Sequence, residues 1–391
     1  MRIWTKLALG VVGLAATGIA GFLIFAPGIV EAGRNKVIPH DPWPVSAQAQ
    51  ALHDRLVIGD WHADPLMWNR DLTERGAYGQ VDLPRLIEGN VAVQVFTAVT
   101  KSPAGQNYEA NSADATDNIT LMAMGQLWPV RTWDSRFERA RYQAQKLHGF
   151  EADAPGMLKI IRTKTDLADV LARRASGERI VGGVLGIEGM HALDGDLANI
   201  GPLFDAGYRL FGLTHFFDNE VAGSLHGLSN AGLTDLGRAV VAETIARDVM
   251  IDLAHASPRT AWEVLALDAR ALVVSHGGTH NHCPVKRNFP DDLMQAIAAK
   301  GGVIGIGYWA EAVCGTTPAQ IVAAIAAAVD LLGEDHVSLG SDYDGSVETH
   351  FDASELAALT HEMLALGWSE DRIVKLMGGN MMRVLAQVLP D

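Results

Sequence analysis

Eight short apolar runs rich in β-branched residues recur along the chain, and the segments between them have helical spacing. Each run is continuously apolar instead of alternating, which is typical of strands buried on both faces in a parallel sheet. This recurrence constrains the fold more than any other feature of the sequence. The runs are RLVIGDW (55–61), VAVQVFTAV (91–99), IVGGVLGI (180–187), YRLFGLT (208–214), VMIDLA (249–254), ALVVS (271–275), GVIGIG (302–307) and HVSLGS (336–341).

The intervening segments supply the second half of the pattern. TPAQIVAAIAAAVDLLG (317–333) and ASELAALTHEMLALG (353–367) space their apolar residues by three and four, and each ends at a glycine. Strand and helix alternating eight times predict an α/β fold of the (β/α)8 TIM-barrel type. A doubly wound open sheet is the structural alternative, but no glycine-rich nucleotide loop follows the first run.

The predicted organisation has three parts. Residues 1–31 form a transmembrane anchor or signal segment, residues 32–52 form a tether and an approach helix, and residues 53–391 form the barrel domain. The interval from about 100 to 179 contains the polar, arginine-rich stretch SRFERARYQAQKLHGF. We therefore expect a helical insertion there.

The N-terminal stretch LALGVVGLAATGIAGFLIFAPGIV (7–30) has no charged residue and is long enough to cross a bilayer as a helix. Arg2 and Lys6 precede it, which favours a cytoplasmic N-terminus and a barrel outside the cytoplasm, in the periplasm or the extracellular space. A cleaved signal, which would make the protein secreted, usually has a shorter apolar core and an Ala-x-Ala-like site. No clean site is present, so an uncleaved membrane helix is favoured.

Charge and cysteine content exclude several classes of protein. Lys and Arg total 31 against 46 for Asp and Glu, a net charge of −15 that repels phosphate backbones and excludes nucleic acid as a partner. The two cysteines, Cys283 and Cys314, are too few for a disulfide scaffold or a structural zinc cluster. In an exported domain they can form one bridge, and two buried free thiols are the alternative.

Potential metal ligands and acid–base groups follow six of the eight runs. In a barrel the C-terminal ends of the strands meet at one rim, so these side chains should gather there. His62 and Asp64 are two positions apart, which in an extended segment places both on the same side. The full set is His62 and Asp64 after the first run, Glu188 after the third, His215 after the fourth, His255 after the fifth, His276 after the sixth and Asp342 after the eighth.

The residue types in this set indicate a metal. Imidazole and carboxylate together favour zinc or a similar transition ion over calcium. A carboxylate can bridge two ions roughly 3.5–4 Å apart, and such a pair activates a hydroxide near neutral pH. Glu188 is the natural bridge because its run lies between the two groups of ligands.

The motifs around these residues resemble the membrane (renal) dipeptidase family of zinc metallopeptidases, over roughly residues 50–388. They are DWHADP, GIEGMHAL, LTHFFDN, IDLAHAS, VVSHGG, KRNFPDD, GSDYDG and GGNMMRVL, in this order. The resemblance implies a (β/α)8 barrel with two zinc ions. It further implies that His62 and Asp64 bind one zinc, that His255 and His276 bind the other, and that Glu188 bridges them.

The same resemblance assigns three further roles. Asp342 would transfer protons at the catalytic centre, His215 would contact the substrate at the scissile group, and Arg287 would bind the substrate's terminal carboxylate. A guanidinium group suits that last task because it meets a carboxylate with two parallel hydrogen bonds. A surface salt bridge with Asp291 or Asp292 is the alternative for Arg287.

The resemblance also implies a Cys283–Cys314 disulfide beside the Arg287 segment, and a homodimer. The expected function is thus a membrane-anchored or exported zinc dipeptidase whose substrates are dipeptides with a free terminal carboxylate. Another dinuclear barrel hydrolase, such as a lactonase, phosphotriesterase or deaminase, is the first alternative. Such enzymes commonly bridge their metals with a modified lysine, whereas this chain has Glu188 at that place. A binding protein with a dead site is the second alternative, yet no expected ligand is missing.

Overall fold

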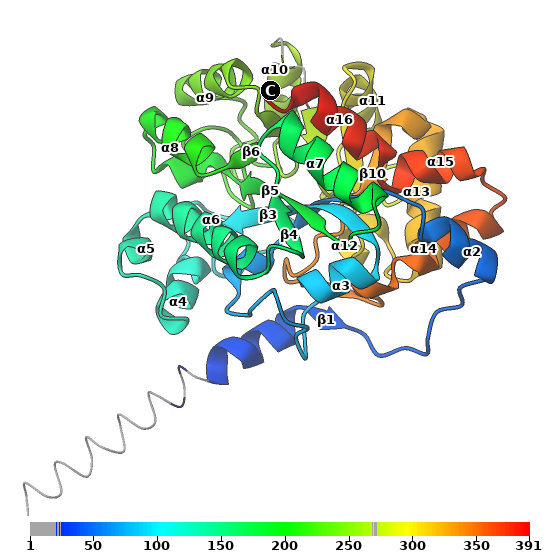
Figure 1. The fold of residues 1–391 in the computed structure, drawn as a ribbon. Coiled ribbons are helices and arrows are strands. Elements are labelled where there is room, and N and C mark those ends of the chain that lie inside the picture. The colour runs from blue at the N-terminus through cyan, green and yellow to red at the C-terminus, as the bar shows by residue number, and fades with distance from the viewer. Residues whose placement is uncertain (1–20, 22, 24, 268, 270–271) are drawn as a thin grey trace, which may run out of the picture.

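The computed structural model of the protein describes residues 21, 23, 25–267, 269 and 272–391. Eight parallel strands form a ring in which β10 pairs with β2 and β3 pairs with β5, so the sheet closes on itself (Figure 1). The predicted (β/α)8 barrel is confirmed. The barrel strands are β2 (Ile58–Ala63), β3 (Val91–Val99), β5 (Val181–Glu188), β6 (Tyr208–Gly212), β7 (Met250–Asp252), β8 (Leu272–Val274), β9 (Val303–Ile306) and β10 (Val337–Leu339).

Every strand of the ring is buried along its whole length, which explains why the eight sequence runs are continuously apolar. Near the rim, glycines in and after the neighbouring strands β9 and β10 allow their backbones to approach the backbone that follows β8. A Cβ atom on Gly305 would lie 2.1 Å from the Ser275 carbonyl oxygen, and one on Gly340 would lie 1.9 Å from it. Only glycine fits at these two positions, and the close approach fixes the backbone next to His276.

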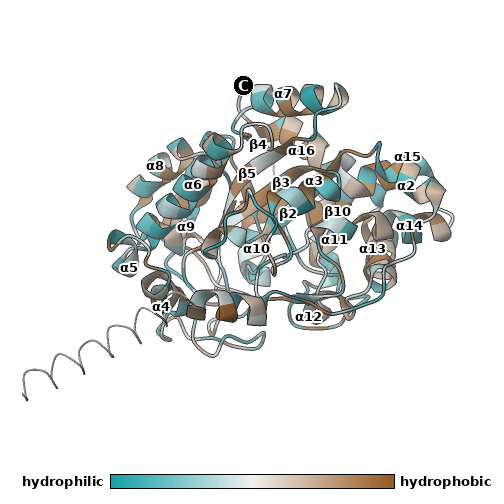
Figure 2. Ribbon diagram, turned by 60° about the horizontal axis from the view of Figure 1, so that its bottom comes forward, coloured by the Kyte–Doolittle hydropathy of each residue, from teal (hydrophilic) through white to brown (hydrophobic). Residues whose placement is uncertain are grey.

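Helices surround the barrel, and their polar faces point outward. Figure 2 shows brown apolar residues on the central strands and teal residues on the outer faces of helices such as α6 and α8. Capping fixes several helix starts: the Thr317 hydroxyl and the Gln320 side chain form a capping box at α13. The surrounding helices are α2 (Ala47–His53), α3 (Leu83–Glu88), α7 (Lys164–Ala175), α8 (Ile200–Asp205), α9 (Asp235–Ala246), α10 (Pro258–Leu265), α11 (Asp291–Ala299), α13 (Pro318–Leu332), α14 (Ala357–Ala365), α15 (Glu370–Val374) and α16 (Asn380–Val388).

The long interval between β3 and β5 contains three helices before α7, namely α4 (Asn118–Gly125), α5 (Arg131–Asp134) and α6 (Arg136–Asp153). It also contains a short strand, β4 (Leu158–Ile160), which pairs in parallel with the first residues of β5 outside the closed ring. The sequence pattern did not predict β4. The helices α4 and α5 lie together at the lower left of Figure 1.

The N-terminal segment runs beside the barrel before the first barrel strand. Residues 25–34 are helical, and β1 (Lys36–Val37) pairs in parallel with β11 (Glu348–Thr349), at the far end of the sequence. Most of the predicted membrane anchor, residues 1–31, lies outside the described residues. Within the described part of the chain, Ala310–Leu332 is long and apolar enough to span a membrane. That stretch is divided at Cys314 into α12 (Ala310–Val313) and α13 and is 56% buried, so it is a helical pair of the barrel wall.

Candidate metal centre

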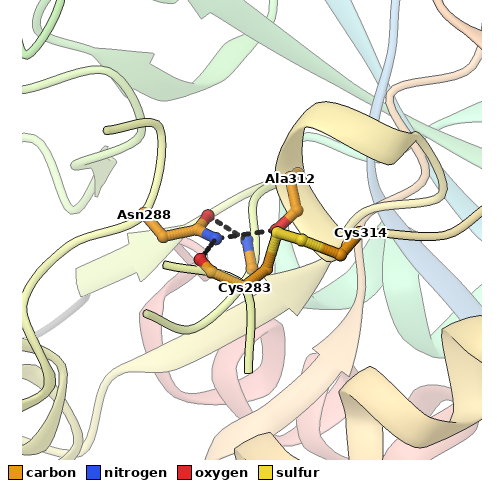
Figure 3. The surroundings of a disulfide bond; sticks show 5 residues. Cys283, Asn288, Ala312 and Cys314 are labelled. Atoms are coloured by element: carbon orange, nitrogen blue, oxygen red, sulfur yellow. Dashed lines mark hydrogen bonds between the residues drawn. A yellow bond between two sulfur atoms is a disulfide. The ribbon is translucent and has the colours of Figure 1, made fainter. Parts of the chain in front are cut away.

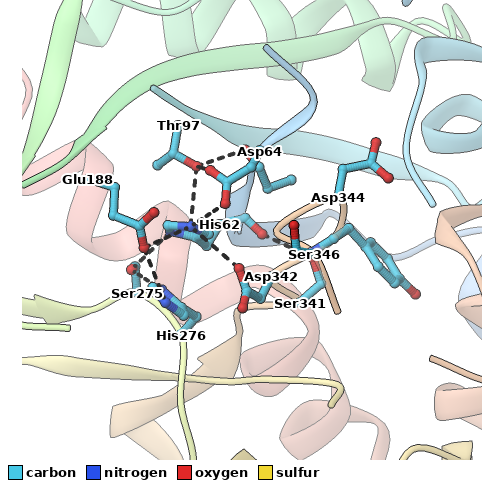
Figure 4. A network of polar contacts seen from close by, with 12 residues as sticks. His62, Asp64, Thr97, Glu188, Ser275, His276, Ser341, Asp342, Asp344 and Ser346 are labelled. Carbon is cyan, nitrogen blue, oxygen red and sulfur yellow. Dashed lines mark hydrogen bonds and ion pairs between the residues drawn. The ribbon is translucent and has the colours of Figure 1, made fainter. Parts of the chain in front are cut away.

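The barrel brings all the predicted ligands and acid–base groups to the C-terminal ends of its strands. His62 lies within β2, Glu188 is the last residue of β5, and the others follow their strands within a few residues. Every member of the set is buried, and Figure 4 shows His62, Asp64, Glu188, His276 and Asp342 pointing toward one another. Seven side chains from distant parts of the sequence therefore form one site.

Glu188 lies at the centre of this site. Its Oε1 atom is 3.1 Å from His255 Nε2, 3.5 Å from His276 Nε2 and 3.6 Å from His62 Nε2. Its Oε2 atom is 3.2 Å from His215 Nε2. Three imidazoles thus approach Oε1 and a fourth approaches Oε2, so Glu188 is the carboxylate around which the predicted ligands gather.

The donor atoms form overlapping groups in which all members lie within 4.8 Å of one another. The groups are His62 with Asp64 and Glu188, His62 with His276 and Asp342, and Glu188 with His215 and His255. His255 Nε2 and His276 Nε2 are 2.9 Å apart, and His62 Nε2 is 3.3 Å from Asp64 Oδ2. His62 and His276 are neighbours as well, with ring centroids 3.8 Å apart, so the two pairs meet at Glu188.

Two aspartates inside the strands hold the ligand-bearing backbone in place. Asp60 Oδ1 accepts hydrogen bonds from the backbone N–H of His62 at 2.9 Å and of Ser341 at 3.2 Å. Asp252 accepts from the N–H of Ser275 at 2.9 Å and from its hydroxyl at 2.5 Å. The Ser275 Oγ atom is in turn 2.9 Å from His276 Nδ1, which orients that ring.

The loops that follow the strands turn sharply. His255 and Asp342 both have left-handed backbone conformations, with φ of 61° in each case. Non-glycine residues adopt this conformation rarely, and it recurs at functional sites. It points both side chains back over the barrel mouth.

Burial and crowding shift the pKa values of the site. Burial, reinforced by Asp64, raises the pKa of Glu188 well above its usual value. Burial also raises the pKa of Asp342 to about 8, opposed by His62 and reinforced by Asp64. For His62 burial lowers the pKa, but Asp64 and Glu188 outweigh it and bring the value to about 10. The raised pKa values show that the buried carboxylates repel one another, and the cationic His62 only partly offsets this repulsion.

The pKa values of His255 and His276 shift in the opposite direction from that of His62. Burial, reinforced by Arg287, lowers the pKa of His255 well below its usual value. Burial and the neighbouring His62 do the same for His276. Neutral imidazoles have a free ring nitrogen for a metal, and carboxylates complete a nitrogen and oxygen donor set that suits zinc and similar ions. A divalent cation would also offset the crowding of negative charge. The residues present therefore fit a metal.

Arg287 is buried beside this centre and has no acidic partner among the described residues. Its Nη2 atom donates to the His276 carbonyl oxygen at 2.8 Å, its guanidinium lies 5.6 Å from the Trp309 ring, and its Nε–H has no hydrogen-bond partner. The surface salt bridge with Asp291 or Asp292 is wrong: Arg287 is only 3% exposed, and Asp291 accepts instead from the Asn281 N–H. A buried donor without a partner is available to a ligand.

A disulfide braces the segment that carries Arg287. Cys283 and Cys314 are bonded and join the chain after β8 to the end of α12 (Figure 3). Asn288 extends the connection, because its Nδ2 atom donates to the carbonyl oxygens of Cys283 at 2.9 Å and Ala312 at 2.7 Å. The position of Arg287 relative to the barrel is therefore fixed from both sides.

A cavity of about 590 Å³ opens over the centre. Polar groups at its base are Asp64, Glu188, His215, His255 and Asp342. The His215 Nδ1 atom lies 3.2 Å from the Lys101 carbonyl oxygen, which leaves Nε2 facing Glu188 and the cavity.

Sequence reasoning missed several residues that shape this cavity. Tyr108, from the loop after β3, lines it, and its hydroxyl accepts from Trp309 Nε1 at 2.9 Å. Burial and the nearby Asp342 raise the Tyr108 pKa, so the phenol stays protonated. No periodicity or motif marked Tyr108. Asp60 and Asp252, by contrast, had a signal, since each is a carboxylate within an apolar run close to a histidine ligand.

A parallel barrel with histidines and carboxylates gathered at its C-terminal rim defines a metal-dependent hydrolase. The model of the membrane dipeptidase family, peptidase family M19, matches residues 46–389. The chain belongs to this family, which confirms both the family and the enzyme class, a metallo-dipeptidase, predicted from the motifs.

Individual relatives agree with this assignment. Dipeptidase aclJ of Aspergillus oryzae is 28% identical over 364 residues, covering 85% of this chain and 78% of that protein. The crystal structure of dipeptidase AC, a family M19 metallopeptidase, has a TM-score of 0.69 and 26% identity and covers 86% of this chain and 99% of its own. A metallopeptidase from Rhodobacter sphaeroides with a bound phosphinate mimic of L-Ala-D-Ala has a TM-score of 0.66 and 25% identity, with coverage of 85% and 99%.

Proposed function

We propose that the protein cleaves dipeptides with two zinc ions held at the rim of its barrel. The observation that carries this proposal is the position of Glu188, whose carboxylate lies within 3.1–3.6 Å of the Nε2 atoms of His62, His255 and His276. His62 and Asp64 would hold one ion, His255 and His276 would hold the second, and Glu188 would be shared between them. When bound, the metal pair lowers the pKa of a water and polarises the scissile carbonyl.

The protein's own side chains then bind the substrate and move its protons. The unpaired Nε–H of Arg287, together with its neighbouring N–H groups, holds the carboxylate at the end of the dipeptide. This requires a free carboxylate one residue beyond the cleaved bond, so longer peptides are excluded. His215 Nε2 faces the centre and would contact the substrate at the scissile group. Because Nδ1–H donates to the Lys101 carbonyl oxygen, Nε2 donates only when the ring holds a second proton, which negative charge developing on the scissile oxygen favours.

Asp342 is the group that transfers protons. It lies 3.7 Å from His62 Nε2 and lines the cavity, where its carboxylate is open to the substrate side. In this role it accepts a proton from the attacking water and delivers it to the leaving amine. Asp344, two residues later, does not share the role because Arg70 and the Gln80 N–H already occupy its oxygens.

Metal removal and restoration test the proposal. The protein is treated with a chelator and then assayed with Gly-Leu, and its metal content is measured by elemental analysis before and after. Activity should disappear with the metal and return when zinc is added. Undiminished turnover by metal-free protein would rule the proposal out. Lactones and phosphotriesters in the same assay test the alternative hydrolase activities, which the bridging Glu188 does not favour.

We further propose that the barrel lies outside the cytoplasm, attached through the N-terminal helix. The uncharged stretch 7–30 supports this location. The Cys283–Cys314 disulfide supports it independently, because such bonds persist in oxidising compartments. A homodimer is proposed on the family resemblance alone. Reading the mature N-terminus would distinguish an anchored protein from a secreted one.

A further inference from the structure

The N-terminal arm, defined here as residues 25–37, lies at the mouth of the catalytic cavity. Ala26, Pro27, Val30 and Arg34 of the arm line the same cavity as the catalytic groups. In Figure 1 the arm is the dark blue helix that leads into β1. The last residues of the predicted anchor, 25–31, thus lie against the barrel and form part of the wall of the candidate active site, so a membrane-crossing helix would have to end before them.

Buried polar contacts fix the arm to the barrel. Glu31 is only 2% exposed and forms an ion pair with Arg70, which also pairs with Asp344. Asn35 is 1% exposed, and its Oδ1 atom accepts from the Ser346 N–H at 2.9 Å. A chain that merely passed over the surface would not bury these groups.

Asn35 contacts the turn that presents Asp342 directly, and Glu31 is linked to the same turn through Arg70. Within this turn Asp342, Asp344 and Ser346 all have left-handed backbone conformations, with φ of 61°, 61° and 67°. Such residues keep this conformation only where their surroundings hold them in it. The arm contributes to that support at Asp344 and Ser346, so its position is tied to that of the catalytic carboxylate.

Apolar side chains from the loop after β2, the end of β3 and helix α4 line the cavity, namely Met67, Trp68, Val99, Ile119 and Met122. Asn118 and Gln126 add polar groups at the two ends of α4. The arm closes this wall with Ala26, Pro27 and Val30. The space between them suits a large apolar side chain.

The position of Arg287 indicates which part of the substrate faces this wall. Arg287 follows β8, which is diametrically opposite β3 in the ring of eight strands. In the proposed function Arg287 holds the carboxyl-terminal residue of the dipeptide. The amino-terminal residue then lies on the β3 side, between the metal centre and the arm.

We propose that the N-terminal arm is a specificity element that forms a pocket for the side chain of the substrate's amino-terminal residue. The pocket selects dipeptides whose first residue is large and apolar. Val30 is the key residue, because it lines the cavity and is still 51% exposed, so a substrate side chain can cover it. The inference rests on the proposed dipeptidase function and deepens it.

Val30→Lys in the full-length protein, solubilised in detergent, tests the proposal. Ile29→Lys is the matched control, since Ile29 is on the same arm, is 70% exposed and does not line the cavity. The two variants add the same charge one residue apart, so long-range attraction of an anionic substrate is equal in both. The substrates are Leu-Gly, Glu-Gly and Gly-Gly, and kcat/KM is measured for each.

In Val30→Lys the ratio of kcat/KM for Leu-Gly over Gly-Gly should fall about tenfold, since the leucyl side chain loses its apolar contact. The ratio for Glu-Gly over Leu-Gly should rise. Both ratios should stay at the wild-type value in Ile29→Lys. Ala26→Leu provides a second test. The larger side chain narrows the pocket, so kcat/KM should fall more for Phe-Gly than for Ala-Gly.

Equal ratios in Val30→Lys and Ile29→Lys, or a uniform loss for all substrates, would overturn the proposal. A uniform loss would mean that the arm only supports the fold. Failure of the proposed function itself is recognised separately, because wild-type protein would then cleave none of the dipeptides.

Discussion

Arg287 differs from an ordinary surface arginine in its burial and in its unused hydrogen-bonding capacity. It is 3% exposed, and burial lowers its pKa, an effect that Tyr108 and Asp342 oppose. Its Nη2 atom donates a hydrogen bond to the His276 carbonyl oxygen, and its Nε–H has no hydrogen-bond partner among the described residues. A buried cation of this kind is costly unless a ligand pairs with it.

The substitution Arg287→Lys should raise KM for Gly-Leu and lower kcat/KM roughly 10- to 100-fold, because an ammonium group cannot form two parallel hydrogen bonds to a carboxylate. The measurement compares Gly-Leu with Gly-Leu amide, which lacks the carboxylate. Wild-type protein should strongly prefer the free acid, and the variant should lose most of that preference. A variant that keeps the full preference would show that another group binds the carboxylate.

At the residue scale, the sequence predicted the ligands better than their supports. His62, Glu188 and His276 were identifiable because each lies at or just after the end of an apolar run, and strand ends share one rim. The supporting role of Ser275 was not predictable, because it depends on a hydrogen bond to Asp252 from the neighbouring strand. Serine is too common at strand ends to mark such a contact.

At the scale of elements, the disulfide joins two segments that are far apart in sequence. Cys283 and Cys314 are separated by 31 residues, so the bond closes a loop containing α11 and β9. Closing a loop of this length restricts the unfolded chain and stabilises the folded one by about 3–4 kcal/mol. The same bond holds the Arg287 segment against α12.

The double substitution Cys283→Ala and Cys314→Ala should therefore lower the free energy of unfolding by about 3–4 kcal/mol, measured by urea denaturation. Reducing agent should lower the stability of the wild-type protein toward that of the variant and leave the variant unchanged. Equal unfolding midpoints for wild type and variant in oxidising buffer would contradict the prediction.

The contact between the arm and the barrel contains a buried carboxyl group, Glu31, whose protonation affects stability. Glu31 faces Arg70, Asp344, Lys146 and Tyr78. Burial raises its pKa from 4.5 to about 7, opposed by Arg70 and reinforced by Asp344. Between pH 4.5 and about 7 the folded chain keeps a proton that the unfolded chain loses. Rising pH therefore favours unfolding across this interval, by up to roughly 3 kcal/mol.

The substitution Glu31→Gln should remove this part of the pH dependence, because glutamine does not titrate. Urea unfolding at about pH 5 and about pH 8 should show a larger loss of stability in the wild type than in the variant. Asp344 also has a raised pKa and is present in both proteins. Glu31 itself raises the pKa of Lys146, which burial lowers to about 7, so the two proteins are compared in a Lys146→Met background. Identical pH slopes would show that Glu31 titrates normally in the folded protein.

The sequence predicted those helices and strands whose own residues form a recognisable pattern. All eight barrel strands coincide with apolar runs, because a strand buried on both faces needs apolar residues throughout. The strands β1, β4 and β11 were missed, since each is only two or three residues long and forms by pairing with a partner distant in the chain. No local pattern records such a pairing.

At the scale of the whole molecule, closure of the barrel brings together residues from position 62 to position 342. Strand order predicts this meeting, since strands that alternate with helices close in sequence order. The arm over the cavity was not predictable, because an uncharged apolar stretch indicates a membrane helix and does not show where its last turns dock. Its docking depends on Arg70, which lies in no motif, and on Asp344, whose place in GSDYDG does not indicate this contact.

Closure also separates the metal centre from the core that stabilises the fold. The apolar core lies in the barrel and between the barrel and its helices, whereas the ligands occupy one rim. The barrel should therefore keep its secondary structure without metal. The rim nevertheless collects the buried carboxylates Asp60, Asp64, Glu188, Asp252 and Asp342, whose mutual repulsion a cation offsets.

Removal of metal should thus leave the far-UV circular dichroism spectrum unchanged while lowering the unfolding temperature. Each ion bound to the folded chain alone, at roughly 100 times its dissociation constant, contributes about 2.7 kcal/mol. Titration of zinc into metal-free protein should raise the unfolding temperature until two ions are bound per chain. A spectrum that collapsed on chelation would mean that the ions hold the barrel together. An unfolding temperature insensitive to zinc would mean that the rim binds no metal in the folded protein.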